Sequence, residues 1–317
     1  MRRLPVRQTL NGKTRERELF VRKVLSGFFG AACGLFISVV MLLRTAGAQD
    51  IDEVKKSGVL RHLGVPYANF VTGGGDGMDV ELMQLFARHL GVKYEYVKTD
   101  WDDAIGDLTG KKVKPKGEGI EVLAEVLVKG DVIANGMTVI PWREKVVNFS
   151  VPTFPNQVWL VARADSPLQP IKPGGDIKKD IAAVKALLRD RTLLSKANTC
   201  LDPSLYNLDV TGARVMLFKG SLNELAPAVL NQEAEVTLLD VPDALVALQK
   251  WPGKIKVIGP ISGVQDMAVA FRKDAPGLHD EFNVFMQRLR KDGALRRIAE
   301  KYYPFVIDYY PAFFKAE

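Results

Sequence analysis

The chain has 317 residues, of which 47% are hydrophobic and 26% charged, and this length is enough for two lobes that each bury a core. The formal net charge of +7 comes from residues 1–48, which hold nine basic and two acidic residues and leave 35 of each kind in the rest of the chain. The charge balance of that body argues against nucleic-acid binding through a basic surface.

The N-terminal segment has the organisation of an export signal. Basic residues lead into an apolar stretch over 25–43, and the small residues Ala46, Gly47 and Ala48 follow. We therefore expect residues 1–48 to be a cleaved signal peptide. The apolar stretch also approaches the roughly 20 residues of a membrane span, so an uncleaved anchor is the alternative. In both cases the basic residues stay in the cytoplasm and the body lies outside.

Cysteine and histidine usage predicts neither a disulfide nor a metal site. After cleavage only Cys200 remains, and it is expected to be a small buried hydrophobic residue. His62, His89 and His279 stand alone, without metal-ligand spacing. We expect no metal and no cofactor.

The first part of the body alternates strand-like and helix-like patterns, which predicts an α/β fold. Strands are expected at 59–65, 93–97 and 131–134, and helices at 80–90 and 102–108. Residues 109–128 break the alternation with several lysines, a glycine and a proline. We interpret them as an insertion that contains an extra strand or a short helix over 121–128.

The same alternation continues to the end of the chain. Strands are expected at 157–162, 192–194, 214–218, 235–239, 255–258 and 268–271, and helices at 176–189, 222–230, 278–289 and 293–302. The tail from Tyr302 to Phe314 is rich in aromatic residues. It is expected to pack against the nearer lobe, and a partner-binding edge is the alternative.

The segment 130–150 is the most informative part of the sequence. A buried strand ends at Asn135-Gly136, and a hydroxyl on Thr138 and a guanidinium on Arg143 follow. Backbone N–H groups, a hydroxyl and a bidentate fork can together hold one small carboxylate. The alternative is an ordinary strand-to-helix loop that carries a surface arginine.

Other polar residues follow predicted strands, where α/β proteins build their clefts. Asp240 directly follows a buried strand and can hold an ammonium group; alternatively it caps a helix that begins with Pro242 nearby. Asn198 and Thr199 lie between a strand and a possible helix, so their N–H groups can bind a carboxylate or serve as an ordinary cap.

Three aromatic residues, Tyr67, Phe70 and Trp101, also follow strands and can line a ligand pocket. For each of them the alternative is core packing. The sequence contains no Gly-x-Ser-x-Gly, P-loop, dinucleotide or His-Glu-x-x-His motif. It therefore points to binding rather than to catalysis.

In their order and spacing these segments resemble one protein family. The matching segments are Tyr67-Ala68-Asn69-Phe70, Gly77 to Leu82, Asp100-Trp101-Asp102, Asn135 to Thr138 with Arg143, Asn148-Phe149-Ser150, Lys196 to Thr199, Asp240, and the helix over 293–302. Together, from about Val59 to Tyr303, they resemble the family 3 bacterial extracellular solute-binding proteins, the amino-acid receptors of ABC importers.

The resemblance implies a two-lobed periplasmic-binding-protein fold of type II. Each lobe is a mixed sheet flanked by helices, and two crossing strands join the lobes. Lobe 1 would comprise residues 51–155 and 266–317, and lobe 2 residues 156–265. The insertion over 109–128 would belong to lobe 1.

The resemblance also implies roles for the candidate residues. Arg143 would clamp the α-carboxylate of a ligand, helped by Thr138 and by backbone N–H groups near Gly136 and Thr199. Asp240 would take the α-ammonium. Tyr67, Phe70 and Trp101 would line the side-chain pocket.

The expected function is that of a monomeric periplasmic receptor. It would capture an amino acid or a related small carboxylate and deliver it to an ABC permease in the inner membrane. One alternative is a sensor or partner protein that residues 25–43 anchor to the inner membrane, without transport. Another is a dehydratase of the same fold, which would need a proton donor directed into the cleft.

Overall fold

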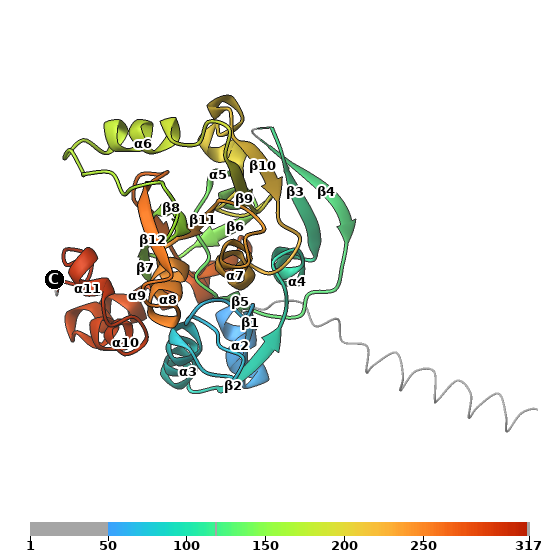
Figure 1. Ribbon diagram of the computed structural model, residues 1–317. Helices are drawn as coiled ribbons and strands as arrows, with labels where there is room; N and C mark the ends of the chain where they lie inside the picture. Colours follow the sequence, from blue (N-terminus) through green and yellow to red (C-terminus); the bar gives the residue numbers. More distant parts are fainter. Residues whose placement is uncertain (1–49, 118, 316–317) are drawn as a thin grey trace, which may run out of the picture. The chain divides into compact units, whose positions relative to one another are not determined.

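The computed structural model describes residues 50–117 and 119–315, and contains two larger sheets (Figure 1). The predicted signal peptide or anchor at 1–48 lies outside the described residues. Among the residues that are described, no helix has both the length and the apolar character needed to cross a membrane.

The first sheet has the strand order β2-β1-β5-β14-β6. Its strands are β1 (Val59–Gly64), β2 (Lys93–Lys98), β5 (Val132–Ile133), β6 (Val147–Phe149) and β14 (Ala270–Arg272). β1 runs parallel to β2 and β5, whereas β14 runs antiparallel to β5 and β6. The sheet is therefore mixed, and β14, which lies between β5 and β6, comes from the C-terminal part of the chain.

The helices of this lobe are α2 (Ile51–Ser57), α3 (Met78–Leu90), α4 (Ala104–Thr109), α5 (Pro141–Glu144), α9 (Pro276–Lys291), α10 (Ala294–Tyr302) and α11 (Val306–Tyr309). α3 forms because apolar residues recur along one face, among them the buried Leu82, Met83 and Phe86. Gly91 ends it in the left-handed conformation, with φ of 73°.

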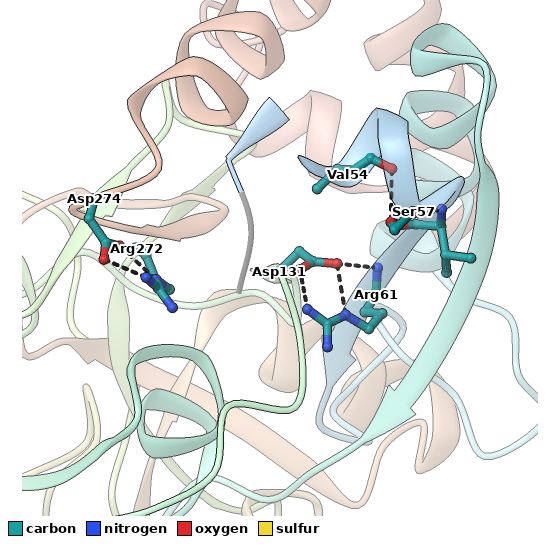
Figure 2. Close-up of polar contacts among 7 residues, drawn as sticks. Val54, Ser57, Arg61, Asp131, Arg272 and Asp274 are labelled. Atoms are coloured by element: carbon teal, nitrogen blue, oxygen red, sulfur yellow. Dashed lines mark hydrogen bonds and ion pairs between the residues drawn. The ribbon is translucent and has the colours of Figure 1, made fainter. Parts of the chain in front are cut away.

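An ion pair fastens β1 to the segment that leads into β5 (Figure 2). The guanidinium of Arg61 donates to both carboxylate oxygens of Asp131, at 2.6 Å and 3.1 Å, and the backbone N–H of Arg61 donates to the same group at 2.8 Å. Asp131 is 1% exposed, so this bidentate pair is shielded from water. It stabilises the register that brings Asn135 and Gly136 to the end of the sheet.

The second sheet has the strand order β10-β9-β11-β8-β12. Its strands are β8 (Val158–Arg163), β9 (Thr192–Ser195), β10 (Arg214–Leu217), β11 (Val236–Asp240) and β12 (Ile255–Pro260); its helices are α6 (Ile177–Ala186), α7 (Leu225–Leu230) and α8 (Val241–Lys250), with 3-10 turns η1 (Pro203–Tyr206), η2 (Asp209–Thr211) and η3 (Leu222–Glu224). β11 is buried along its whole length, including the polar Thr237 and Asp240.

Two short antiparallel strands lie between these sheets in the chain, β7 (Phe154–Asn156) and β13 (Gln265–Met267). The chain enters the second sheet after β7 and leaves it before β13. This topology confirms the predicted fold, with two sheet-containing lobes and two crossing strands. The expected lobe boundaries, after residues 155 and 265, stay a prediction.

The insertion is a two-stranded hairpin formed by β3 (Lys111–Lys116) and β4 (Gly119–Glu125). Of the two alternatives for 121–128, the strand is therefore the one observed. Val122, Leu123 and Leu127 are exposed on this hairpin. Its base packs on α4, where Val126 lies against Gly106.

The helices expected over 102–108 and 222–230 differ from the observed ones. The helix expected over 102–108 begins at Ala104, because the Asp100 carboxylate accepts from the backbone N–H groups of Asp102 and Asp103 and holds them in a turn. The helix expected over 222–230 splits into η3 and α7.

The aromatic tail packs as predicted, at least in part. Tyr303 is 2% exposed and its ring contacts those of Phe70 and Phe154, while Phe314 is buried against Phe154. Phe305 and Tyr309 remain half exposed. They line a groove of about 570 Å³ together with Leu245, Leu248 and Gln249 of α8 and with Pro252, which follows that helix.

Candidate ligand-binding site

Arg143 is a buried cation in α5. Ile140 is extended and Pro141 opens the helix, which directs the chain sharply after the end of the strand. Arg143 is 3% exposed, and its Nη1 donates to the Thr138 carbonyl at 2.9 Å. Its Nε has no hydrogen-bond partner among the described residues. The alternative of a surface arginine is therefore wrong.

Two indole rings flank this guanidinium. Its central carbon lies 5.8 Å from the ring centroid of Trp101 and 5.5 Å from that of Trp142. Burial lowers the pKa of Arg143, but guanidinium keeps its charge in proteins. The result is a positive group, desolvated and oriented, with donor capacity left for an anion.

Gly136 lies at a point where no side chain fits. Its φ is +65°, and a Cβ there would lie 2.3 Å from the Phe70 ring. Its N–H donates to the Asp79 carboxylate at 2.7 Å. This N–H is thus already bonded within the protein, and the expectation that backbone N–H groups near Gly136 meet a ligand stays a prediction.

Asp79 belongs to the first turn of α3 and is 1% exposed. Burial raises its pKa to about 7, and the hydrogen bond from Gly136 opposes the shift only in part. Its structural role is to fix the turn that follows β5.

Thr138 lies between Arg143 and the crossing strands. It is 1% exposed, and its Oγ1 accepts from Nδ2 of Asn156 at 3.2 Å. Its carbonyl is the group that holds Arg143. Thr138 thus orients the cation as well as presenting a hydroxyl.

Asp240 ends β11 and is 1% exposed. Its Oδ1 accepts a hydrogen bond from the Tyr67 hydroxyl, and its Oδ2 accepts from Sγ of Cys200 at 3.3 Å. Burial raises the pKa of Asp240 to about 6, against the effect of these two hydrogen bonds. Asp240 occupies the N-cap position of α8, but its side chain makes no capping hydrogen bond.

The predicted aromatic residues separate into two kinds. Tyr67 and Trp101 lie edge to face with ring centroids 5.5 Å apart, next to Asp240 and Arg143 respectively. Phe70 is fully buried among Phe154, Tyr303 and the backbone of Gly136. The structure therefore favours the core-packing alternative for Phe70, whose ring supports the turn at Gly136.

The turn at Asn198 and Thr199 uses its polar groups internally. The N–H of Asn198 donates to Asp202 at 2.8 Å, and the hydroxyl of Thr199 donates to the carbonyl of Lys196 at 2.8 Å. The next residue, Cys200, is the one that contacts Asp240. The N–H of Asn198 is therefore used within the turn, while the expected role of the Thr199 N–H stays a prediction.

Sequence reasoning missed three residues near this site. Cys200 is buried, as predicted, and burial raises the pKa of its thiol, but its hydrogen bond to Asp240 was not predicted. Asn156 and Gln265 lie in the crossing strands. The only signal for Asn156 was a polar residue that interrupts an otherwise apolar stretch.

The structure offers no metal centre within the part of the chain that it describes, because no three His, Cys, Asp or Glu side chains gather there. His62 is a core residue. Its Nδ1 lies 2.9 Å from the Tyr94 hydroxyl and its Nε2 lies 2.6 Å from the Ala134 carbonyl. Burial lowers its pKa to about 4, so it is neutral at physiological pH.

The site therefore combines a buried guanidinium, a buried carboxylate and aromatic rings. The charges of Arg143 and Asp240 are near enough to interact. The guanidinium acts to lower the pKa of Asp240, and the carboxylate acts to raise the pKa of Arg143, in each case against the larger effect of burial. A model of the bacterial extracellular solute-binding proteins, family 3, matches residues 62–305, which include all of these groups. The chain belongs to this family.

Relatives within and near this family include both binding proteins and an enzyme. L-cystine-binding protein TcyJ of Escherichia coli is 26% identical over 259 residues, covering 80% of this chain and 85% of that protein. Membrane-bound lytic murein transglycosylase F of Desulfosudis oleivorans is 27% identical over 231 residues, covering 72% of this chain. The chain spans only 44% of the transglycosylase's length.

Solved structures agree with this placement. A mutant of ArgBP from T. maritima aligns with a TM-score of 0.63 and 26% identity, covering 80% of this chain and 99% of that chain. The family 3 fold, with its two lobes, thus accounts for the two sheets and the crossing strands.

Proposed function

We propose that this protein is an exported receptor that binds an amino acid between its two lobes. The observation that carries the proposal is the pair of buried opposite charges, Arg143 after the first sheet and Asp240 at the end of β11 in the second. A zwitterion needs a cation for its α-carboxylate and an anion for its α-ammonium, and both charges are worth more in a desolvated site.

Arg143 and Asp240 would act at opposite ends of the ligand. Arg143 would hold the α-carboxylate with the Thr138 hydroxyl, and Asp240 would hold the α-ammonium. Tyr67 and Trp101 would contact the ligand side chain. Cys200, as a neutral thiol, would complete the wall beside Asp240.

Transport is the role that family membership favours. The protein would be periplasmic, would act as a monomer, and would deliver its ligand to an ABC permease of the inner membrane. An anchor at residues 25–43 remains compatible with this role, since it would only restrict the receptor to the membrane surface. N-terminal sequencing of the exported protein distinguishes a start at Gln49 from an intact anchor.

Thermal denaturation with candidate ligands tests the binding proposal. L-arginine and L-cystine are the first probes, because the similar proteins are named for them. A ligand at 100 times its Kd should add about 2.7 kcal/mol to the free energy of unfolding. If no amino acid changes the melting temperature of the wild-type protein, the proposal is wrong.

Two matched ligand analogues test each half of the clamp. Agmatine lacks the α-carboxylate of arginine, and 5-guanidinopentanoate lacks the α-amine. Arg143→Ala should abolish the shift with arginine, and Asp240→Asn should weaken it. Agmatine should be insensitive to Arg143→Ala, and 5-guanidinopentanoate should be insensitive to Asp240→Asn.

Surface substitutions provide the controls. Arg296 pairs with Glu300, and Asp165 pairs with Arg163, both at the surface. Arg296→Ala and Asp165→Asn should therefore leave every ligand shift unchanged. An unchanged shift with Arg143→Ala would contradict the carboxylate assignment.

A further inference from the structure

Two polar amides lie side by side in the crossing strands. Asn156 of β7 and Gln265 of β13 are register partners in the antiparallel ladder. Asn156 is fully buried, and Oε1 of Gln265 is buried without a partner among the described residues. Polar side chains in such positions are costly unless they have a specific geometry to maintain.

Asn156 joins the two halves of the candidate site directly. Its Nδ2 donates to Oγ1 of Thr138 at 3.2 Å, and its Oδ1 accepts from the N–H of Val241 at 3.2 Å, an N–H that it shares with the Gln157 carbonyl at 3.0 Å. Thr138 holds Arg143 through its carbonyl, and Val241 is the residue after Asp240. One planar amide therefore spans from the arginine side to the aspartate side.

Gln265 is connected to the Asp240 carboxylate by a separate chain of contacts. Its Nε2 donates to the Tyr206 hydroxyl at 3.3 Å, and that hydroxyl donates to the Cys200 carbonyl at 2.5 Å. The thiol of Cys200 in turn donates to Asp240 at 3.3 Å. The chain of contacts from Gln265 thus ends on the oxygen of Asp240 that Tyr67 does not use.

We propose that Asn156 and Gln265 are positioning residues that align Arg143 with Asp240 when the lobes close. Closure of a two-lobed receptor is a rotation about its crossing strands, and side chains on those strands move least. Hydrogen bonds from these strands to both halves select one closed arrangement, because any other leaves buried polar groups unpaired. The proposal rests on the proposed function only in assuming that a ligand occupies the space between the two halves.

Alkylation of Cys200 in the ligand-free protein tests the proposal. Its thiol is 4% exposed and its pKa is raised by burial, so N-ethylmaleimide reacts only when the lobes separate. Mass spectrometry of the Cys200 peptide distinguishes it from Cys33, the other cysteine. Asn156→Ala and Gln265→Ala should each accelerate alkylation about tenfold, the ratio expected for loss of a buried hydrogen bond.

Thr153 provides the matched control. It is 1% exposed beside the same strand, and its hydroxyl donates to the Met267 carbonyl at 3.2 Å rather than to Arg143, Thr138 or Asp240. Thr153→Val should lower the melting temperature and leave the Cys200 alkylation rate within about twofold of wild type. Asn156→Ser and Gln265→Ser retain a polar group too short to reach either partner, and they replace the alanine variants if those do not fold.

The outcomes are distinct. Faster alkylation in the Asn156 and Gln265 variants, but not in Thr153→Val, supports the positioning role. Equal alkylation rates in all variants, with only a lower melting temperature, would overturn it. The alkylation rates are measured without ligand, so they decide the positioning proposal whether or not the protein binds an amino acid. A failure of every amino acid to protect Cys200 in the wild-type protein would count against the proposed function alone.

Discussion

Tyr67 donates its hydroxyl hydrogen bond to Oδ1 of Asp240, so the segment after β1 in the first lobe is joined to the end of β11 in the second. The backbone N–H of the neighbouring Ala68 donates a hydrogen bond to the side-chain Oδ1 of Asn223 at 2.9 Å. The phenol therefore occupies one oxygen of the carboxylate that we assign to the ligand's α-ammonium. Ligand binding would have to displace this bond or share its acceptor.

Replacing Tyr67 by Phe should affect stability and affinity in opposite directions. The ligand-free protein should lose about 1–3 kcal/mol of unfolding free energy, because a buried carboxylate loses a donor. Affinity for an amino acid should rise, since the ammonium no longer competes with the hydroxyl. Thermal denaturation and calorimetric titration measure the two effects.

Tyr94→Phe is the control for this substitution. The Tyr94 hydroxyl contacts His62 in the core of the first lobe, away from Asp240. It should lower stability without changing the Kd. Weaker ligand binding by Tyr67→Phe would mean that the hydroxyl serves the ligand rather than competing with it.

Ligand affinity should depend on pH through Asp240. Burial raises its pKa to about 6 in the ligand-free protein, and only the carboxylate attracts an ammonium group. Affinity should therefore be constant above pH 6 and fall below it, approaching about tenfold per pH unit. Titrations from pH 4.5 to 8 measure this, and Asp240→Asn should bind weakly with a flat profile over the same range.

Protein stability should depend on pH through Asp79. Its folded pKa of about 7 lies above its ordinary value of 3.8, so the native state holds this proton more tightly than the unfolded state. The contribution of Asp79 to stability is thus fully present below pH 3.8 and is lost as pH rises to 7, by up to about 4 kcal/mol.

Asp79→Asn isolates this effect, because its amide oxygen still accepts from the Gly136 N–H. The variant should gain stability relative to the wild type between pH 4.5 and pH 7.5. Denaturant unfolding at both values provides the comparison. Parallel stability curves for the two proteins would show that Asp79 is ionised throughout.

Gly136→Ala should destabilise the turn on which the carboxylate side depends. The new Cβ would lie 2.3 Å from the Phe70 ring at a φ of +65°, so steric overlap adds to backbone strain. We expect a loss of about 2–4 kcal/mol. Gly91→Ala has a similar φ of +73° with nothing within 4 Å, and it should cost only about 1 kcal/mol.

Equilibrium unfolding of these two variants separates strain from overlap. Equal losses in Gly136→Ala and Gly91→Ala would show that the Phe70 ring moves aside at little cost. In that case Phe70 would not be the rigid support of the turn.

Local sequence patterns were sufficient to predict the strands that lie next to the candidate site. The run from Val132 to Gly136 predicted a buried strand with an abrupt end, and the apolar residues before Asp240 predicted another. These patterns work because burial and backbone conformation leave a periodic trace in neighbouring residues. They also located Arg143 and Asp240, since each closely follows such a strand.

What only the tertiary structure decided was which atoms meet. Gly136 donates its N–H to Asp79, Phe70 packs in the core, and the thiol of Cys200 contacts Asp240. The partners in these contacts lie far apart in sequence, or compete for one donor within a turn. Sequence by itself determined the fold class and both charged groups. The hydrogen-bond partners of Arg143 and Asp240 were decided by the tertiary structure, because packing between distant segments leaves no periodic signal along the chain.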